Sequence, residues 1–352
     1  MRLLCGTSQP VRSTAVLLLF CVLVAGCGVK SEKSKQYAYV SAPQVMLRDN
    51  VAAVFNKVGT VKNGERVEVL EKNRRFVRVR TANNEIGWME QRYLVDQQVY
   101  DGFQKLAADH AHDVTQAHAT TRYDVNLHLT PDRESDHFYQ LKDGEKVELL
   151  ARATASKAGP AAAATPVSEK KNTPPPAPVL EDWWIVRDAH GNAGWLLARL
   201  VDFDVPIDIA QYAEGQRIVA YFVLNEVPDE GKQEPQYLVA MTEPKDGLPY
   251  DYDQIRVFTW NLRKHRYETA YRDRKLPGVF PITVGQQNFD KEGTLPTFTL
   301  RLKDESGQVT SATYKLNGPI VKRVLAPGEQ SKAAPRLAAE KKQTHRPKSR
   351  RH

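Results

Sequence analysis

Short runs in which apolar and polar residues alternate recur along most of the chain, separated by turn dipeptides. Two sets of runs, about a hundred residues apart, share the same order and spacing. The matching blocks are 63–70 and 143–150, 75–80 and 183–187, and 86–89 and 193–196. A period of two is typical of half-buried strands, and the Asn-Gly and Asp-Gly pairs that open the first blocks favour hairpin turns. The pattern therefore predicts one small antiparallel barrel written twice.

The stretch between the two sets has a different period. Val99, Phe103, Leu106 and Ala107 are spaced as on one face of a helix, which predicts a helix from about Gln97 to His112. After the second set, strand-like runs continue to the end of a third region, over 205–326. The eight runs are 217–224, 236–241, 254–260, 267–271, 278–284, 297–302, 310–316 and 320–324. They predict an antiparallel β-sandwich or open barrel, so the expected fold class is mainly β.

The N-terminus carries a short apolar core, Ser13 to Val24, after basic residues, and it is too short for a stable transmembrane helix. Leu23-Val24-Ala25-Gly26-Cys27 resembles the lipobox of bacterial lipoproteins. The resemblance implies that residues 1–26 are a signal peptide and that Cys27 carries a diacylglyceryl group and an acyl chain such as palmitate. Residues 27–35 are then a tether. The alternative is an ordinary secretion signal in which Cys27 is incidental.

Both repeated units resemble bacterial SH3 (SH3b) domains in their Gly-Glu-x-Val strand, central aromatic strand and late Gly-Trp pair. The resemblance implies two small SH3-like barrels, over 36–96 and 120–203, joined by a helical linker at 97–119. The second unit departs from the family through an Ala- and Pro-rich insertion over 154–179, which is predicted to be disordered.

The amino-acid composition excludes some classes of functional site and of partner. Cys5 and Cys21 lie in the leader, so a mature chain has neither a disulfide nor a cysteine nucleophile. The net charge of +8 comes mainly from a basic tail over 330–352, predicted to be disordered, whose partner, if any, stays open. Nucleic acid is not expected as a partner of an exported protein. No cofactor is expected either.

Metal and hydrolase sites are not favoured by the pattern. His110 and His112 would point to opposite sides of a helix, so with His118 they do not form a metal site. No hydrolase motif is present, and we expect no enzyme activity. The acids Asp246, Asp251, Asp253 and Asp290 are interpreted as turn and strand-end residues rather than a glycosidase pair.

Aromatic residues are the remaining candidates for ligand contact. Trp183 and Trp184 fall on opposite faces of one strand. With Trp184 in the core, Trp183 is predicted to be exposed and to contact a ligand, together with Tyr39 and Tyr93. The alignment leaves open whether Trp183 or Trp184 corresponds to Phe76 of the first unit.

These features predict a membrane-anchored cell-envelope lipoprotein that binds peptidoglycan or envelope proteins without catalysing a reaction. A scaffold that binds only proteins and a cell-wall hydrolase with an unrecognised site in the third region are the alternatives. Gly28 rather than Asp after Cys27 favours the outer membrane facing the periplasm, or the cell surface in a Gram-positive organism.

Overall fold

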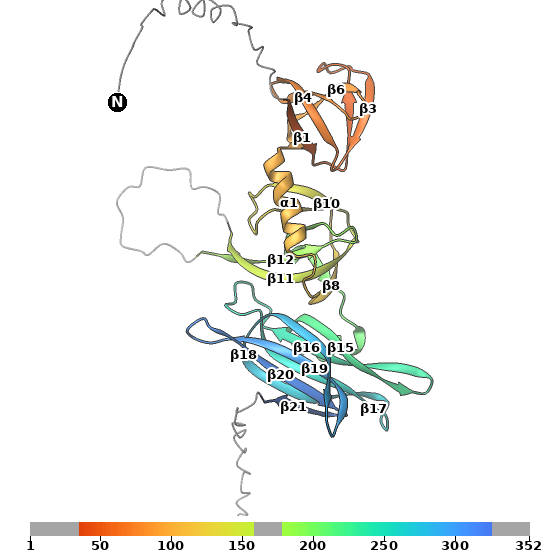
Figure 1. Cartoon of the computed structure of the whole chain (residues 1–352), viewed down its shortest axis with the longest axis vertical. Helices are drawn as coiled ribbons and strands as arrows, with labels where there is room; N and C mark the ends of the chain where they lie inside the picture. Colours follow the sequence, from red (N-terminus) through yellow and green to blue (C-terminus); the bar gives the residue numbers. More distant parts are fainter. Residues whose placement is uncertain (1–34, 158–177, 326–352) are drawn as a thin grey trace, which may run out of the picture.

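The structure is a computed structural model that describes residues 35–157 and 178–325. It contains three antiparallel sheets of seven strands each, stacked end to end, with helix α1 between the first two (Figure 1). The mainly β, antiparallel fold class predicted from the sequence is confirmed. The insertion core at 158–177, Cys27 and the basic tail lie outside the described residues.

The first sheet has the strand order β3-β2-β6-β5-β4-β1-β7. Its elements are β1 (Gln36–Val40), β2 (Gln44–Arg48), β3 (Lys57–Lys62), β4 (Arg66–Asn73), β5 (Phe76–Arg80), β6 (Ile86–Glu90), the 3-10 turn η1 (Gln91–Tyr93) and β7 (Leu94–Val95). Gly64, after β3, has a φ of 83°, a left-handed conformation that glycine adopts without a Cβ penalty. The predicted Asn63-Gly64 turn is therefore confirmed.

The second sheet repeats this order as β10-β9-β13-β12-β11-β8-β14. Its elements are β8 (Ala117–Thr121), β9 (Val125–His128), β10 (His137–Leu141), β11 (Lys146–Ser156), β12 (Leu180–Arg187), β13 (Ala193–Leu197), η2 (Ala198–Leu200) and β14 (Val201–Phe203). The predicted disordered insertion starts too early, because Thr154 to Ser156 pair with Leu180 to Asp182. These residues extend the hairpin beyond the body of the sheet.

Helix α1 (Gln97–Asp109) joins the first two sheets. It begins at Asp96, whose side chain accepts a hydrogen bond from the Val99 N–H, and it buries Phe103 completely. The helix ends three residues before the predicted His112. There the His110 ring lies 2.7 Å from the Asp113 carboxylate in the following turn.

The third sheet is a simple meander in which each strand pairs with the next. After the short helix α2 (Ile207–Ala210) come β15 (Arg217–Asp229), β16 (Lys232–Thr242), β17 (Tyr252–Asn261), β18 (Arg266–Phe289), β19 (Gly293–Lys303), β20 (Val309–Asn317) and β21 (Ile320–Val324). The predicted strands 267–271 and 278–284 are one strand, β18. Its first half pairs with β17 and its second half with β19.

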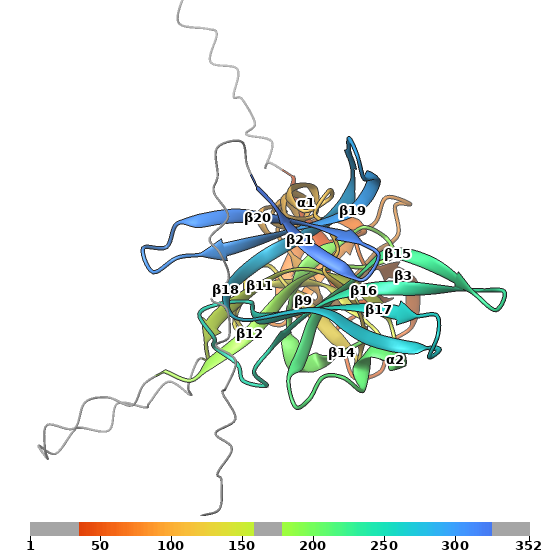
Figure 2. The same cartoon turned by 90° about the horizontal axis from the view of Figure 1, so that it is seen from below.

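None of the three sheets closes into a barrel, because no hydrogen bonds join their end strands within the described residues. The two repeated units are therefore open sheets rather than the predicted barrels, and the third region is one sheet rather than two packed sheets. The third sheet curls so that β15 approaches β18 and β19. Seen from its own end, it spreads across the second unit (Figure 2).

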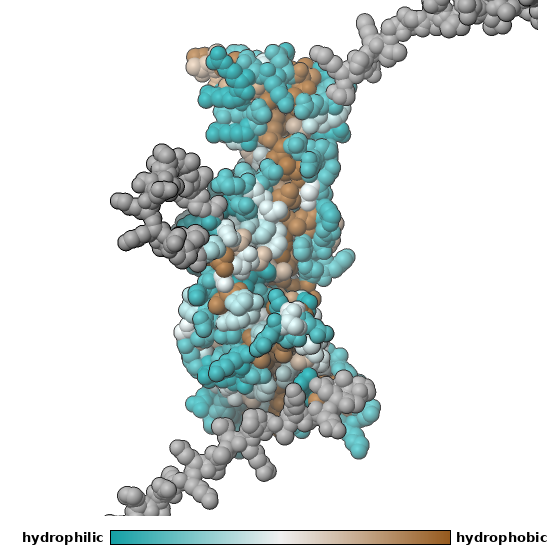
Figure 3. All heavy atoms as spheres, turned by 90° about the vertical axis from the view of Figure 1, so that its left-hand side faces the viewer, coloured by the Kyte–Doolittle hydropathy of each residue, from teal (hydrophilic) through white to brown (hydrophobic). Residues whose placement is uncertain are grey.

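One hydrophobic cluster continues through the molecule, from Tyr39 in the first sheet to Leu316 in the third. The Tyr39 ring stacks on Tyr100 of α1 with centroids 3.8 Å apart, and the Tyr39 hydroxyl donates to Gln97. At the next junction the buried Gln116 side chain accepts from the Ile282 N–H and donates to the Ile282 carbonyl. Figure 3 shows a band of hydrophobic residues running down one side of the first two units.

Candidate functional site

The strand registers of the first two sheets make their residues directly comparable. Arg48 on β2 pairs with Trp88 on β6, and His128 on β9 pairs with Trp195 on β13. Both central hairpins also shift register at the same point, after Val69 in β4 and after Leu149 in β11. The two sheets are therefore one arrangement built twice, position by position.

The same registers identify the residue that corresponds to Phe76. Phe76 pairs with Glu90, and Trp183 pairs with Leu197 at the same place in the second sheet. Trp183, not Trp184, therefore corresponds to Phe76. In the first unit the residue beside Phe76 is Val77, so the second unit carries an additional tryptophan.

The predicted exposure of Trp183 is wrong. Trp183 is 3% exposed and Trp184 is 2% exposed, although they point to opposite faces of β12 as expected. The Trp183 ring packs edge-on against His128, with centroids 5.4 Å apart. The Trp184 ring, on the other face of β12, lies 5.4 Å from Phe280 of the third sheet.

Trp183 nevertheless lines a groove of about 300 Å³ in the second unit, which we call the second groove. Its polar lining includes Tyr123, Asn126, His128, Arg133 and Arg199. Tyr123 is 64% exposed and stands at the rim. The groove thus has an aromatic base, an exposed aromatic edge and polar walls, which suits an extended peptide or a glycan.

The ionisable side chains of the second groove differ in their hydrogen-bond and ion-pair partners. Arg133 forms a two-pronged ion pair with Glu181, and this pairing lowers the pKa of the Glu181 carboxyl. Burial lowers the pKa of His128, which favours the neutral ring. Arg199 is exposed and makes no hydrogen bond or ion pair to any residue in 35–157 or 178–325.

The first unit has a smaller groove at the equivalent place, with a volume of about 180 Å³, which we call the first groove. Arg48 stands where the second groove has His128, and Met46 stands where it has Asn126. Tyr93 lines the first groove and lies under the Arg92 guanidinium, 4.7 Å from the ring centroid. The two grooves share a backbone but present different chemistry.

The predicted contact residues therefore separate into two groups. Trp183 and Tyr93 line the two equivalent grooves, where ligand contact stays a prediction. Tyr39 is 7% exposed and is packed between the first sheet and α1, so it is placed to stabilise that junction. Cys27 lies outside the described residues.

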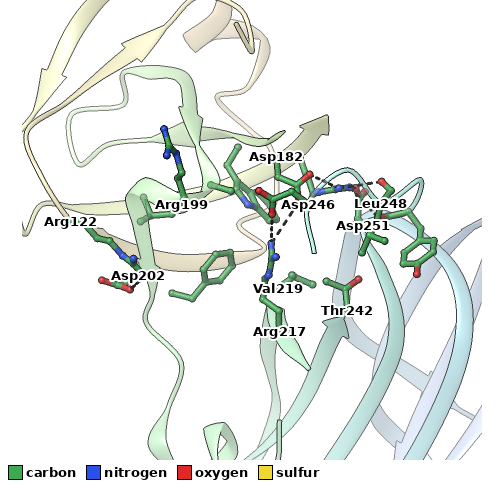
Figure 4. Close-up of a pocket in the computed structure, with 16 residues that line it drawn as sticks. Arg122, Asp182, Arg199, Asp202, Arg217, Val219, Thr242, Asp246, Leu248 and Asp251 are labelled. Atoms are coloured by element: carbon green, nitrogen blue, oxygen red, sulfur yellow. Dashed lines mark hydrogen bonds and ion pairs between the residues drawn. The ribbon is translucent and has the colours of Figure 1, made fainter. Parts of the chain in front are cut away.

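A third hollow, a cleft of about 350 Å³, lies between the second unit and the third sheet (Figure 4). Its wall contains the buried Arg152, which donates to Asp182 at 2.7 Å and to Asp251 at 3.1 Å. Arg217 reaches Asp246 at 3.1 Å. Burial raises the pKa of Asp251 above its usual range, although Arg152 lies beside it.

The cleft contains two of the four acids considered from the sequence, Asp246 and Asp251, but not Asp253 or Asp290. Sequence reasoning did not find Asp182, Arg152 or Arg217. A charged residue inside an apolar run, such as Asp182 before Trp183-Trp184, was the available signal. In the described parts of the chain, no three His, Cys, Asp or Glu residues are grouped to hold a metal ion. Among the same residues, no helix has the length and apolar character needed to span a membrane.

Comparison with known proteins agrees with the geometry of the first unit. Residues 48–95 match the bacterial SH3 domain family. The match begins at the end of β2 and ends with β7. No relative was found among curated proteins.

Similar solved structures include an NlpC/P60 family protein from Bacillus cereus ATCC 10987, at 12% identity and a TM-score of 0.21, over 66% of this chain and 93% of that one. NlpC2 from Trichomonas vaginalis has 9% identity and a TM-score of 0.17, over 70% and 99% of the two chains. NlpC1 from the same organism has 9% identity and a TM-score of 0.16, over 68% and 89%. Likeness at this level carries no argument about activity.

Proposed function

We propose that this protein is a lipid-anchored adaptor of the bacterial cell envelope that binds peptidoglycan through two SH3b units and catalyses no reaction. The observation that carries the proposal is the SH3 match at 48–95 together with the identical strand order and register of the second sheet. Bacterial SH3 domains commonly bind the cell wall, so two equivalent grooves supply two contact sites for it.

The lipid anchor and the location rest on the sequence around Cys27. A diacylglyceryl-modified Cys27 holds the protein to a membrane, and Gly28 favours the outer membrane facing the periplasm. A non-enzymatic role is supported by the state of the cleft acids. Asp182 and Asp251 are both engaged by Arg152 and by backbone N–H groups, an arrangement that structural ion-pair networks also show.

The test is a pull-down of the full-length protein on purified sacculi. Tyr123→Ala removes the exposed aromatic edge of the second groove, and Met46→Ala removes an exposed side chain of the first. Because aromatic contacts often dominate a binding surface, Tyr123→Ala is expected to weaken binding about tenfold. Leu262→Ala, an exposed apolar residue on the β17–β18 turn, is the matched control.

Unchanged binding by both groove variants would remove the grooves as the contact surface. Binding of envelope proteins without any binding of sacculi would favour a protein scaffold instead. Clearing of a peptidoglycan gel by the purified protein would establish a hydrolase and end the proposal of a non-enzymatic role.

A further inference from the structure

The 3-10 turn η2 forms a ridge between the second groove and the cleft. Successive residues around it line one hollow or the other: Leu197 and Leu200 line the groove, and Ala198 and Val201 line the cleft. Arg199 lines both. The two hollows are therefore neighbours separated by a few residues of one turn.

Strand β12 gives each hollow an aromatic residue. Trp183 lies in the groove, while Trp184 lies in the cleft beside Phe203, with ring centroids 5.8 Å apart. The first unit has Val77 in place of Trp184, and no third sheet packs on it. Val77 is buried in the core of the first unit, whereas Trp184 packs both within its own unit and against the third sheet.

In the cleft, the buried hydrogen-bond acceptors have partners among the described residues, whereas several donors do not. Its buried acids are occupied: Asp182 accepts from Arg152 and the Gly247 N–H, and Asp251 accepts from Arg152 and the Phe280 N–H. Several donors are not. Arg199 has no hydrogen bond or ion pair within the described chain, and Arg217 pairs through Nη1 alone.

Thr242 adds a second, buried group. It is 4% exposed, lines the cleft, and its hydroxyl has no partner among the described residues (Figure 4). Thr242 lies directly opposite Arg217 in the β15–β16 pair, so the two side chains share one face of the sheet. The hollow therefore offers spare donors on both walls, which is the pattern that accepts an anionic, acceptor-rich group.

We propose that the second groove and the cleft bind one extended ligand, and that Arg199 pairs with a carboxylate of that ligand where it crosses the η2 ridge. This inference rests on the proposed function, since it assigns the ligand to the carboxylate-bearing peptides of the cell wall. It also gives the third sheet a role, because Arg217 and Thr242 extend the binding surface beyond the SH3-like unit.

The experiment measures the affinity of the full chain for the disaccharide peptides that a muramidase releases from sacculi. A second probe is the same mixture after its carboxylates are converted to amides. Arg199→Gln should weaken binding of the acidic probe about tenfold or more, because a charge-assisted hydrogen bond is lost. The amidated probe should bind the native protein and Arg199→Gln equally weakly.

Arg92→Gln is the matched control, because Arg92 holds the position of Arg199 in the first unit but is already paired with Glu90 at 2.9 Å. It should bind the acidic probe like the native protein. Arg217→Gln and Thr242→Val should each weaken binding severalfold if the ligand enters the cleft. The melting temperature of Arg199→Gln should change little, since the exposed residue makes no hydrogen bond or ion pair within the described residues and interacts with Glu181 only through a longer-range Coulombic attraction.

Two results would overturn this inference but leave the proposed function standing. One is binding of the acidic probe that does not change in Arg199→Gln. The other is binding that depends on Arg199 but not on Arg217 or Thr242. The first removes the carboxylate contact and the second confines the ligand to the groove. Failure of the native protein to bind either probe at millimolar concentration would overturn the proposed function as well.

Discussion

Arg152→Met tests how the second unit is held to the third sheet. The Arg152 side chain is 7% exposed and links Asp182 of β12 to Asp251, which precedes β17. It also donates to the carbonyls of Leu248 and Tyr250. Met fills a similar volume but leaves Asp251 without its cation and Asp182 with only Arg217, at 3.7 Å.

The expected cost follows from that geometry. Removing one partner of a buried ion pair costs about 3 to 5 kcal/mol, because an uncompensated charge stays buried. Here two carboxylates lose Arg152, but each keeps a backbone N–H, from Gly247 and from Phe280, and Asp182 keeps Arg217 at 3.7 Å. We therefore expect the free energy of unfolding at neutral pH to fall by about 3 to 5 kcal/mol.

The deficit should depend on pH in a defined direction. The pKa of Asp251 is already raised by burial, and losing Arg152, which lowers it, raises it further. The pKa of such a carboxyl is higher in the folded protein than in the unfolded chain. Its contribution to the free energy of unfolding is therefore greatest at a pH low enough to protonate it in both the folded and the unfolded state. That contribution is lost as the pH rises from the ordinary Asp value through the folded pKa. The variant should therefore be closest to the native protein near pH 4.

The measurement is urea unfolding at several pH values, followed by the intrinsic fluorescence of the five tryptophans, which include Trp183 and Trp184. Arg122→Met is the control, since the Arg122–Asp202 pair is exposed and should contribute about 0 to 1 kcal/mol. A loss below about 1 kcal/mol for Arg152→Met, or a deficit that does not shrink toward acid pH, would refute the reasoning.

Three further predictions concern other parts of the chain. Cys27→Ser should leave an unprocessed precursor that takes up no radiolabelled palmitate, and palmitate entering that variant would contradict the lipid anchor. Replacing 158–177 by a short Gly-Ser turn should leave the melting temperature within about 8 °C of the native value, because the β11–β12 pairing ends at Ser156 and Leu180. Tyr39→Phe should cost about 0.5 to 1.5 kcal/mol by removing the hydroxyl bond to Gln97 while keeping the stack on Tyr100, and urea unfolding with no change would show that the bond contributes nothing.

The parts of the fold that were predicted correctly are those encoded by local pattern. Period-two runs and turn dipeptides identify most strands, and helical spacing identifies α1 to within three residues. The third sheet was harder, because a long strand such as β18 changes partner half-way and looks like two strands in sequence. Whether strands form one curled sheet or two packed sheets depends on pairing, which local pattern does not encode.

In the candidate site, too, local pattern predicted the orientation of side chains but not the contacts between distant segments. Alternation along β12 correctly placed Trp183 and Trp184 on opposite faces, but it gave no information about what covers each face. Trp183 is covered in part by the His128 ring of β9, more than fifty residues earlier, and Trp184 also contacts Phe280, almost a hundred residues later. The cleft was missed for the same reason, since Arg152, Asp182 and Asp251 belong to distant segments and meet only through packing between two sheets.

The hydrophobic cluster that runs from Tyr39 to the third sheet has a consequence for distance. The first sheet joins this cluster through Tyr39 and the partly buried Val95, which pack with α1, so turning that sheet away from α1 would expose apolar surface. This packing favours one separation and one relative angle for the first and second grooves. If both grooves bind one polymer as proposed, a polymer whose binding points repeat at that spacing would occupy both and gain from their linkage, whereas one with a different repeat would occupy only one. The proposed binding would then depend on the repeat length of the polymer as well as on its chemistry.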